Sequence, residues 1–461
     1  RAVTRAPTRA ANGAWSSEDV IVFVSLGRPI SRVAASGGEP DPVSGLTQQG
    51  SNFSLSFLPD GRHFLYYVRG TSDTRGVYVG NIEAPIAPRR LVDADSGAVY
   101  TSGHLLFVRQ QTLLAQRFDA AALQISGAPF PVASDVTSIV SRAGVSASSD
   151  GTLLFQRAGP PRRPQLGWFD RSGNLLTELN AKLLPGFASP SLSPDGDRVV
   201  FYAGAGGNPD VWSFEIRRGA VSKLTTHLAD DTSPVWSPDG TRIAFGSNRD
   251  ATHTIFLKPV AVGAEETPLF SSPDSKTVSD WSPDGRLLII HVQSAKTAFD
   301  IWAVPTDGSR EPYPLIQTEF EELYPRFSPD GRWIAYQSDQ SGRDEIYIQP
   351  FPGPGSKVQV STEGGSQVRW RADGRELFYL GLDERLMAVS LRLPTTADAT
   401  PVVEAPSPLF AAPLGGAVHQ ADFRPQYVVS ADGQRFLFAA IPQRPDAPAS
   451  LIINWTPKPN Q

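Results

Sequence analysis

The sequence predicts an all-β fold, a β-propeller of about ten four-stranded blades, and three observations lead to this prediction. A turn-forming tetrapeptide recurs at a nearly constant interval along the 461 residues. Short runs rich in β-branched and aromatic residues flank the copies. No segment of useful length has the period of an amphipathic helix. Repeats of about 40–50 residues with four strands each are typical of propeller blades.

The repeated tetrapeptide is Ser-Pro-Asp-Gly. Its clean copies are Ser193–Gly196, Ser237–Gly240, Ser282–Gly285 and Ser328–Gly331, and looser copies are Leu58–Gly61, Ser149–Gly151, Ala372–Gly374 and Ala431–Gly433. From Gly196 onward, the glycines follow at 240, 285, 331 and 374, so the intervals are 44, 45, 46 and 43 residues. Proline presets one turn dihedral, aspartate accepts backbone hydrogen bonds, and glycine supplies a positive φ. Each copy therefore predicts a hairpin between two antiparallel strands.

Two further strands are predicted after each hairpin. The third strands are expected at 210–214, 253–257, 300–304 and 345–348, and the fourth at 222–225, 267–270, 314–316 and 357–360. The second strand of each unit is almost continuously apolar, which is typical of a sheet that is covered on both faces. The ninth unit carries an insertion, through 394–396 and 405–408, that we expect to be a surface loop.

Ten hairpins are expected in total, and the chain must then close its end blades. The hairpins are expected near Asp19, Gly61, Gly103, Gly151, Gly196, Gly240, Gly285, Gly331, Gly374 and Gly433. The last unit offers three strands, at 426–430, 435–439 and 450–455. Residues 175–179 could supply its fourth, which would close a six-bladed ring. We therefore expect four blades of a second ring in residues 1–165 and a six-bladed propeller in residues 166–461, with 159–164 as the boundary. The alternative is one ten-bladed ring that is closed by residues 2–5.

Composition excludes several classes of protein and site. Hydrophobic residues make up 40% of the chain and charged residues 19%, as in globular proteins. With no cysteine there can be no disulfide, thiolate metal site or cysteine nucleophile. The net charge is −5 and no basic stripe is present, so we expect no nucleic-acid partner. No run approaches the length of a membrane span, so we expect no membrane insertion by this chain. Because its first residue is Arg1, we expect a piece of a longer protein whose anchor lies elsewhere.

Motifs for catalysis are not found, so we assign no catalytic, cofactor-binding or metal-binding residue and expect no cofactor. The chain has no phosphate-binding glycine loop, and it has no kinase motif. The nearest approach to a serine-hydrolase elbow, residues 144–148, lacks the second glycine. The histidines lie in different units without ligand-like spacing: His63, His104, His227, His253, His291 and His419.

Two acidic groups invite a functional interpretation. The turn aspartates Asp195, Asp239, Asp284, Asp330, Asp373 and Asp432 would lie at equivalent places around a ring and could bind a cation. We favour a structural role, in which each accepts hydrogen bonds from its own turn. The run Glu319–Glu322 could receive a basic partner, but we expect a solvated loop.

The repeat resembles the TolB-type propeller repeats, a branch of the WD-like propellers. The similarity is specific over about 187–391. Longer stretches at 57–66, 91–96 and 327–336, with the ending Ile452–Trp455, resemble the C-terminal propeller region of bacterial transmembrane serine/threonine protein kinases. In that family the kinase is inside the cell and the propeller outside the membrane. The resemblance therefore implies an extracytoplasmic sensory or interaction module, and it carries no catalytic residue onto this chain.

We accordingly expect a non-catalytic binding or sensor scaffold whose loops receive a protein, peptide or glycan. The sequence does not assign its ligand-binding residues. The alternative is a hydrolase or peptidase-associated propeller with a site in its channel. Such an enzyme would need clustered titratable groups in a central pocket.

Overall fold

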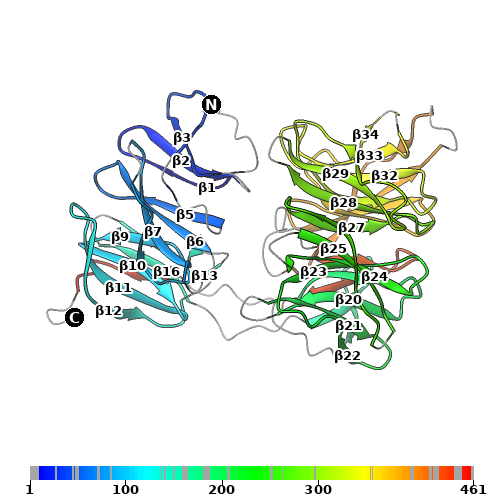
Figure 1. Cartoon of the computed structure of the whole chain (residues 1–461), viewed down its shortest axis with the longest axis horizontal. Coiled ribbons are helices and arrows are strands. Elements are labelled where there is room, and N and C mark those ends of the chain that lie inside the picture. The colour runs from blue at the N-terminus through cyan, green and yellow to red at the C-terminus, as the bar shows by residue number, and fades with distance from the viewer. Residues whose placement is uncertain are drawn as a thin grey trace. The chain divides into compact units, whose positions relative to one another are not determined.

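The computed structural model consists of antiparallel sheets (Figure 1). It describes residues 10–25, 29–43, 46, 51–69, 73–83, 86–136, 138–139, 142–148, 151–157, 165–179, 187–204, 208–249, 253–261, 263–294, 297–353, 355, 357–394, 399–414, 418, 425–440 and 449–457. No α-helix occurs among these residues, and most of their sheets have four strands, so the predicted all-β propeller fold is confirmed. The chain divides into two compact units, Arg1–Pro161 with Arg444–Gln461, and Arg162–Gln443.

Five sheets of the second unit are built from consecutive strands. The first two contain β19 (Ala188–Leu192), β20 (Arg198–Ala203), β21 (Asp210–Glu215) and β22 (Ala220–Lys223), then β23 (Asp231–Trp236), β24 (Arg242–Ser247), β25 (His253–Pro259) and β26 (Thr267–Ser272). The next two contain β27 (Lys276–Trp281), β28 (Leu287–Ser294), β29 (Ala298–Pro305) and β30 (Tyr313–Ile316), then β31 (Glu322–Phe327), β32 (Trp333–Ser338), β33 (Glu345–Pro350) and β34 (Val358–Gln359). The fifth contains β35 (Ser366–Trp370), β36 (Glu376–Leu380), β37 (Arg385–Arg392), β38 (Val402–Val403) and β39 (Ser407–Ala411).

The ninth hairpin unit differs from its prediction at the insertion. Part of the expected surface loop is strand β39, which pairs with β37, whereas residues 395–398 lie outside the described residues. Strand β37, the third of this sheet, thereby supplies hydrogen-bond partners to the backbone groups of residues 407–411.

The sixth sheet closes the second unit with strands from both of its ends. Its order is β18 (Leu175–Leu179), β17 (Gln165–Phe169), β41 (Phe436–Ala440) and β40 (Tyr427–Val429). The expected donor at 175–179 does form the outer strand. The expected third strand at 450–455 is wrong, because β17 takes that place beside β41. The first strands β19, β23, β27, β31, β35 and β40 each contact the next, and β40 contacts β19. This unit is therefore a closed six-bladed ring, not part of a ten-bladed one.

The first unit contains four further sheets and a short hairpin. Three sheets are β1 (Ala10–Trp15), β2 (Val20–Ser25), β3 (Ser31–Ala34) and β4 (Asp41–Pro42); β5 (Ser51–Phe57), β6 (His63–Arg69), β7 (Gly76–Asn81) and β8 (Arg89–Val92); and β9 (Ala98–Thr101), β10 (His104–Arg109), β11 (Thr112–Asp119) and β12 (Gln124–Ala133). The fourth contains β15 (Val145–Ala147), β16 (Leu153–Gln156) and β42 (Ala449–Ile452), and the hairpin contains β13 (Ser138–Ile139) and β14 (Arg142–Ala143). The C-terminal strand β42 pairs with β16, so the segment expected to finish the last blade finishes this sheet instead.

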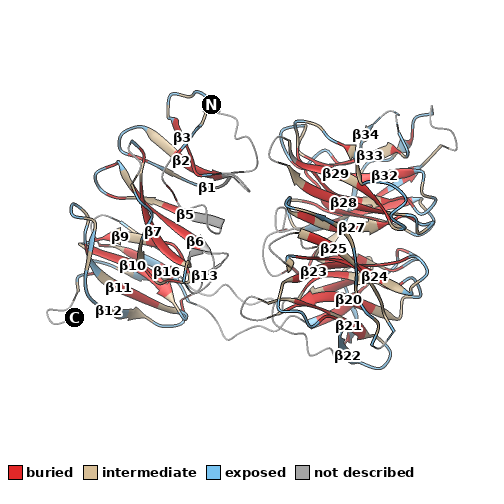
Figure 2. Ribbon diagram, viewed as in Figure 1, coloured by how far each residue is buried: buried red, intermediate tan, exposed pale blue. Residues whose placement is uncertain are grey.

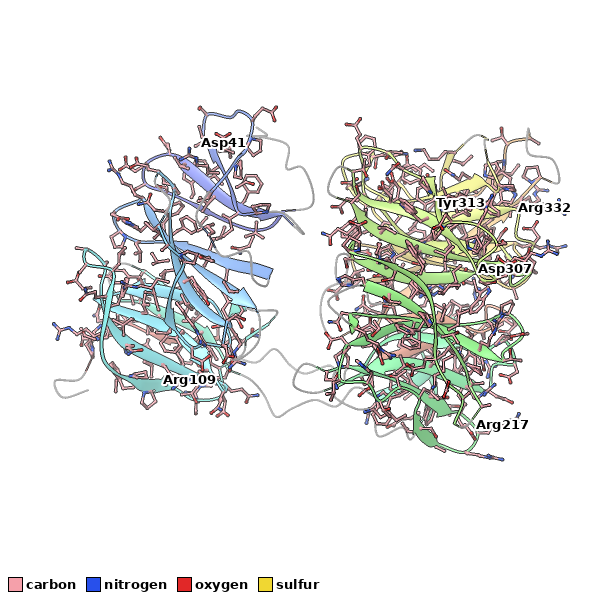
Figure 3. The ribbon with its side chains drawn as sticks, in the orientation of Figure 1. Asp41, Arg109, Arg217, Asp307, Tyr313 and Arg332 are labelled. Atoms are coloured by element: carbon pink, nitrogen blue, oxygen red, sulfur yellow. The ribbon has the colours of Figure 1, made fainter. Side chains whose placement is uncertain are left out.

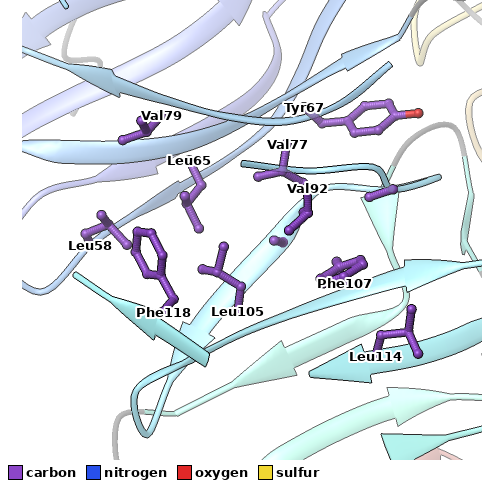
Figure 4. Close-up of a cluster of buried hydrophobic side chains, with 12 residues drawn as sticks. Leu58, Leu65, Tyr67, Val77, Val79, Val92, Leu105, Phe107, Leu114 and Phe118 are labelled. Atoms are coloured by element: carbon purple, nitrogen blue, oxygen red, sulfur yellow. The ribbon is translucent and has the colours of Figure 1, made fainter. Parts of the chain in front are cut away.

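Apolar side chains from facing sheets form the core between blades. In the first unit, Leu65 and Val79 of one sheet pack with Leu105 and Phe118 of the next (Figure 4). In the second unit, the middle strands β20, β28 and β32 are buried along most of their length (Figure 2). Burial on both faces explains why these strands lack alternation in the sequence.

The ten expected hairpins are all present. The residue at which each was expected has a positive φ, from 56° at Asp19 to 85° at Gly151. Nine of the ten are glycines, which adopt this conformation without steric cost. The repeat therefore locates the turn between the first and second strand of every blade.

Candidate functional site

The Ser-Pro-Asp-Gly turns are held by their own side chains. Ser237 Oγ donates to Asp239 Oδ1 at 2.5 Å and accepts from the Arg242 N–H at 3.0 Å. Asp239 Oδ1 also accepts from the Thr241 N–H at 3.0 Å, and the Gly240 N–H donates to the Ser237 carbonyl at 2.9 Å. The same serine–aspartate bond recurs at Ser193–Asp195, Ser282–Asp284, Ser328–Asp330 and Ser430–Asp432. These hydrogen bonds give the aspartates the structural role within the turn that we favoured from the sequence.

These turns also contact one another from blade to blade. Pro194 lies against Gly240, Pro238 against Gly285, and Pro283 against Gly331. In each pair, a Cβ added to the glycine would meet the proline ring at 3.6 Å. These four turns therefore form a packed rim along part of one end of the ring.

A pocket of about 310 Å³ opens at this end of the channel. All six first strands contribute to its wall. The residue that does so in every blade is the second before the turn serine or its equivalent: Ser191, Val235, Asp280, Arg326, Arg369 and Val428. The residue that follows it is usually aromatic, as in Trp236, Trp281, Phe327 and Trp370. Convergence of six blades with three charged side chains makes this pocket the candidate functional site.

Backbone bulges aim these side chains toward the channel. In five of the six first strands the pairing register shifts just before the lining residue. Four residues at these shifts have positive φ although none is glycine: Ser189 (52°), Ser233 (53°), Tyr324 (51°) and Gln367 (58°). Such conformations cost about 1 kcal/mol or more each and gather at functional sites. Bulges redirect side chains in the same way.

The aromatic residues fix the lining residues of the blade before them. Trp236 Nε1 donates to the Ser191 carbonyl at 3.1 Å, and Trp370 Nε1 donates to the Arg326 carbonyl at 3.3 Å. The Phe327 N–H donates to Asp280 Oδ2 at 2.9 Å. In these three pairs of blades, a residue of the later blade thereby holds the lining residue of the blade before it.

The pocket is lined by more cationic than anionic side chains. Arg326 Nη1 lies 3.4 Å from Asp280 Oδ1, and the two side chains are 15% and 26% exposed. Arg369 is 8% exposed, donates from Nη1 to the Val368 carbonyl at 2.9 Å, and has its guanidinium carbon 5.5 Å from the Tyr427 ring centre. Two guanidinium groups face one carboxyl group, so the pocket is positive whether or not Asp280 is ionised.

Burial shifts the pKa values of Asp280, Arg369 and the nearby His291. Burial raises the pKa of Asp280, against the opposing effect of Arg326. Burial, and then the like charge of Arg326, lowers the pKa of Arg369 to about 9. Burial also lowers the pKa of the neighbouring His291 to about 3, so this histidine stays neutral. A group of shifted pKa values in a pocket is a mark of functional sites.

The histidines named from the sequence do not gather. His63 Nδ1 lies 2.5 Å from Asp60, His104 is buried against Trp455, and His291 contacts Ser279, whereas His419 lies outside the described residues. Within the described residues no three histidine or carboxylate side chains form a potential metal-binding group. The arginine pair Arg217–Arg218 is exposed and makes ion pairs with carboxylates; Figure 3 shows Arg217 at the periphery.

The acidic run at 319–322 is not the solvated loop that we expected. Glu321 and Glu322 are 3% and 1% exposed. Thr318 Oγ1 donates to Glu322. Burial, reinforced by the charge of Asp300, raises the pKa of Glu322 to about 8. Glu322 is the first residue of strand β31 and is therefore buried in the sheet. The run of acidic residues in the sequence did not indicate this burial.

Sequence reasoning missed Asp280, Arg326 and Arg369, because each stood in a run that was interpreted only as a strand. The signal was available in the repeat itself. When the blades are aligned on the turn, charge appears at one equivalent position in three successive units. A charged residue within a buried strand is unusual without a partner or a function.

A second pocket, of about 660 Å³, lies between the turn of the fourth consecutive sheet and that of the fifth. Asp330, Asp373 and Arg375 are among its lining residues. Asp330 and Asp373 already accept hydrogen bonds from their own turns. It draws on two blades only, so the channel pocket remains the stronger candidate.

The comparisons with known proteins place the middle of the chain among TolB-like propellers. Residues 179–322 match the family model described as the TolB beta propeller domain. The Tol-Pal system protein TolB of Francisella tularensis subsp. holarctica (strain OSU18) is 24% identical over 181 residues. That match covers 38% of this chain and 41% of the relative, so the chain spans about two fifths of the relative's length.

Two further similarities are to a peptidase and to a solved structure. The uncharacterized peptidase YuxL of Bacillus subtilis (strain 168) is 24% identical over 211 residues, which are 37% of this chain and 32% of the relative. A solved structure of a putative TolB from Agrobacterium tumefaciens has 20% identity and a TM-score of 0.48, covering 60% of this chain and 98% of that one. Among the residues that the structure describes, no helix has the length and apolar character that a bilayer span requires.

Proposed function

We propose that this chain is a non-catalytic binding scaffold whose ligand, a protein, peptide or glycan, docks at the channel pocket of the six-bladed unit. The observation that carries the proposal is the convergence of six equivalent positions on one pocket that contains Asp280, Arg326 and Arg369. The rigid rim of turns supplies a preorganised frame, which lowers the entropic cost of binding. The resemblance of the chain to the propeller region of transmembrane kinases supports the proposal that it is an extracytoplasmic sensory module.

A second candidate is a propeller associated with a hydrolase or peptidase. The similarity to the peptidase YuxL over 211 residues favours it. In that case the channel would admit substrate toward a catalytic site. The described residues of the pocket offer one carboxyl group and two guanidinium groups, and this set lacks a nucleophile with an adjacent base.

The test is selection from a hexapeptide library and a glycan array with the whole protein. Ser191→Trp would fill the mouth of the pocket, and Ser222→Trp places the same bulk on the exposed outer strand β22 as a matched control. We expect ligands that the wild type and Ser222→Trp retain and Ser191→Trp loses. We also expect mass spectrometry to recover these ligands intact. Equal capture by both variants would contradict the proposed site, and cleaved peptides would favour the second candidate.

A further inference from the structure

The unused hydrogen-bond donors of the channel pocket define the chemistry of its ligand. Arg369 Nη2 and Arg326 Nε belong to residues that line the pocket, and the Tyr427 hydroxyl belongs to the buried ring over which Arg369 packs. All three atoms are buried and have no hydrogen-bond partner among the described residues. All three can donate, and a guanidinium group can only donate. Buried donors without acceptors are costly, so a group rich in acceptors is needed to satisfy them.

These donors lie close together. The Arg369 guanidinium packs over the Tyr427 ring, and burial, together with the like charge of the nearby Arg326, lowers the pKa of Arg369. Both arginines line the same pocket. Arg369 is more than nine-tenths buried, so its free Nη2 is held in place by the packing around it.

We propose that this pocket recognises a carboxylate of a peptide, with Arg369 and Arg326 as its donors. This inference rests on the proposed function and names the ligand class for the same site. A carboxylate offers two acceptor oxygens, and its pairing with guanidinium is among the stronger charge-assisted hydrogen bonds. One added negative charge also offsets the excess positive charge of the pocket.

The walls favour a peptide over a sugar. The pocket wall contains apolar surface from Val235, Val428 and the turn prolines Pro194 and Pro238. The indole N–H groups of Trp236, Trp281 and Trp370 already donate to backbone carbonyls within the fold. Apart from Arg326, Arg369, Asp280 and the hydroxyl groups of two serines, the side chains that line the pocket are apolar, which suits a carboxylate on a peptide better than a hydroxyl-rich glycan.

The experiment measures affinities of the hexapeptides that the library selects, each made in three forms. One form is unaltered, one has its C-terminal carboxylate amidated, and one has Asp and Glu replaced by Asn and Gln. We expect one of the two altered forms to bind about tenfold more weakly, which tells a terminal carboxylate from a side-chain one. Arg369→Met should abolish this difference, whereas Arg375→Met, an exposed arginine outside the pocket, should preserve it.

Asp280→Asn supplies a second test, because its expected result is tighter binding, which loss of folding cannot produce. Asparagine keeps an acceptor for the Phe327 N–H but removes the negative charge beside Arg326. We expect tighter binding of the carboxylate form by several-fold, and unchanged or weaker binding would contradict the inference. Peptides that need the open pocket but bind equally in all three forms would overturn the carboxylate while leaving the proposed function intact. Binding that survives Ser191→Trp would overturn the site itself.

Discussion

The serine of each turn has more structural consequence than the aspartate that draws the eye in the sequence. Ser237 is 1% exposed and links the aspartate to the start of the second strand, whereas Asp239 is exposed. The hydrogen bond from Ser237, followed by the bonds from Thr241, lowers the pKa of Asp239 to about 2. The carboxyl group therefore stays ionised as part of a local network, with no sign of reactivity.

We expect Ser237→Ala to lower the free energy of unfolding by about 1–3 kcal/mol, because the partly buried Arg242 N–H loses its acceptor. Thr241→Ala is the matched control, since Thr241 is exposed and its N–H donor is retained. Chemical denaturation of both variants measures the difference. Equal stabilities would contradict the role given to the serine.

The buried Glu322 predicts a pH dependence of stability. Its pKa in the folded protein, about 8, lies above its ordinary value of 4.5, so the folded state holds a proton that the unfolded state releases. Its contribution to stability is therefore complete below pH 4.5 and is lost as the pH rises through 8.

We expect Glu322→Gln to flatten the decline in melting temperature over this pH range. The exposed neighbour Glu319 provides the matched variant, Glu319→Gln, which should leave the decline as in the wild type. Calorimetry at several pH values makes the comparison. The same decline in Glu322→Gln as in the wild type would mean that another group titrates.

At the scale of elements, the closing strands were harder to predict than the blades. Each hairpin is specified by local turn chemistry, so the repeat located all ten. The partner of residues 449–452 depends instead on contacts between residues far apart in the sequence. The Trp455 and His104 ring centres are 5.6 Å apart, and the backbone N–H of Trp455 donates to the Gly151 carbonyl. Pairing between distant strands leaves little local signal, which is why 450–455 was assigned to the wrong sheet.

The pocket shows the same limit. The turns that frame it were predicted, and the charged positions were visible in the repeat. The bulges next to Arg326 and Arg369 could not be predicted, because Tyr324 and Gln367 are residues that rarely adopt positive φ. Their conformation is imposed by the packed ring around them.

We expect Trp455→Ala to destabilise the first unit by about 3–5 kcal/mol, since this side chain is 9% exposed and packs into the core of that unit. Leu451→Ala changes an exposed residue of the adjoining strand β42 and should cost less than about 0.5 kcal/mol. Hydrogen exchange at β16 and β42 reads the effect locally. Unchanged protection there in Trp455→Ala would contradict the pairing of the C-terminal strand with this unit.

At the scale of the whole molecule, a chain with a net charge of −5 carries a locally positive pocket. General electrostatic attraction of anions is therefore weak, and recognition depends on the pocket itself. Salt should weaken ligand binding only modestly, because buried charges are screened less than surface ones.

The most direct test of the binding site uses the nine tryptophans as reporters. Trp236, Trp281 and Trp370 line the channel pocket, whereas Trp15 and Trp455 belong to the first unit. Each indole N–H gives a separate NMR signal, which Trp→Phe variants assign. On saturation with a peptide selected from the library, we predict that the signals of Trp236, Trp281 and Trp370 shift together. Shifts confined to Trp15, Trp455 or other tryptophans outside the pocket would contradict the account.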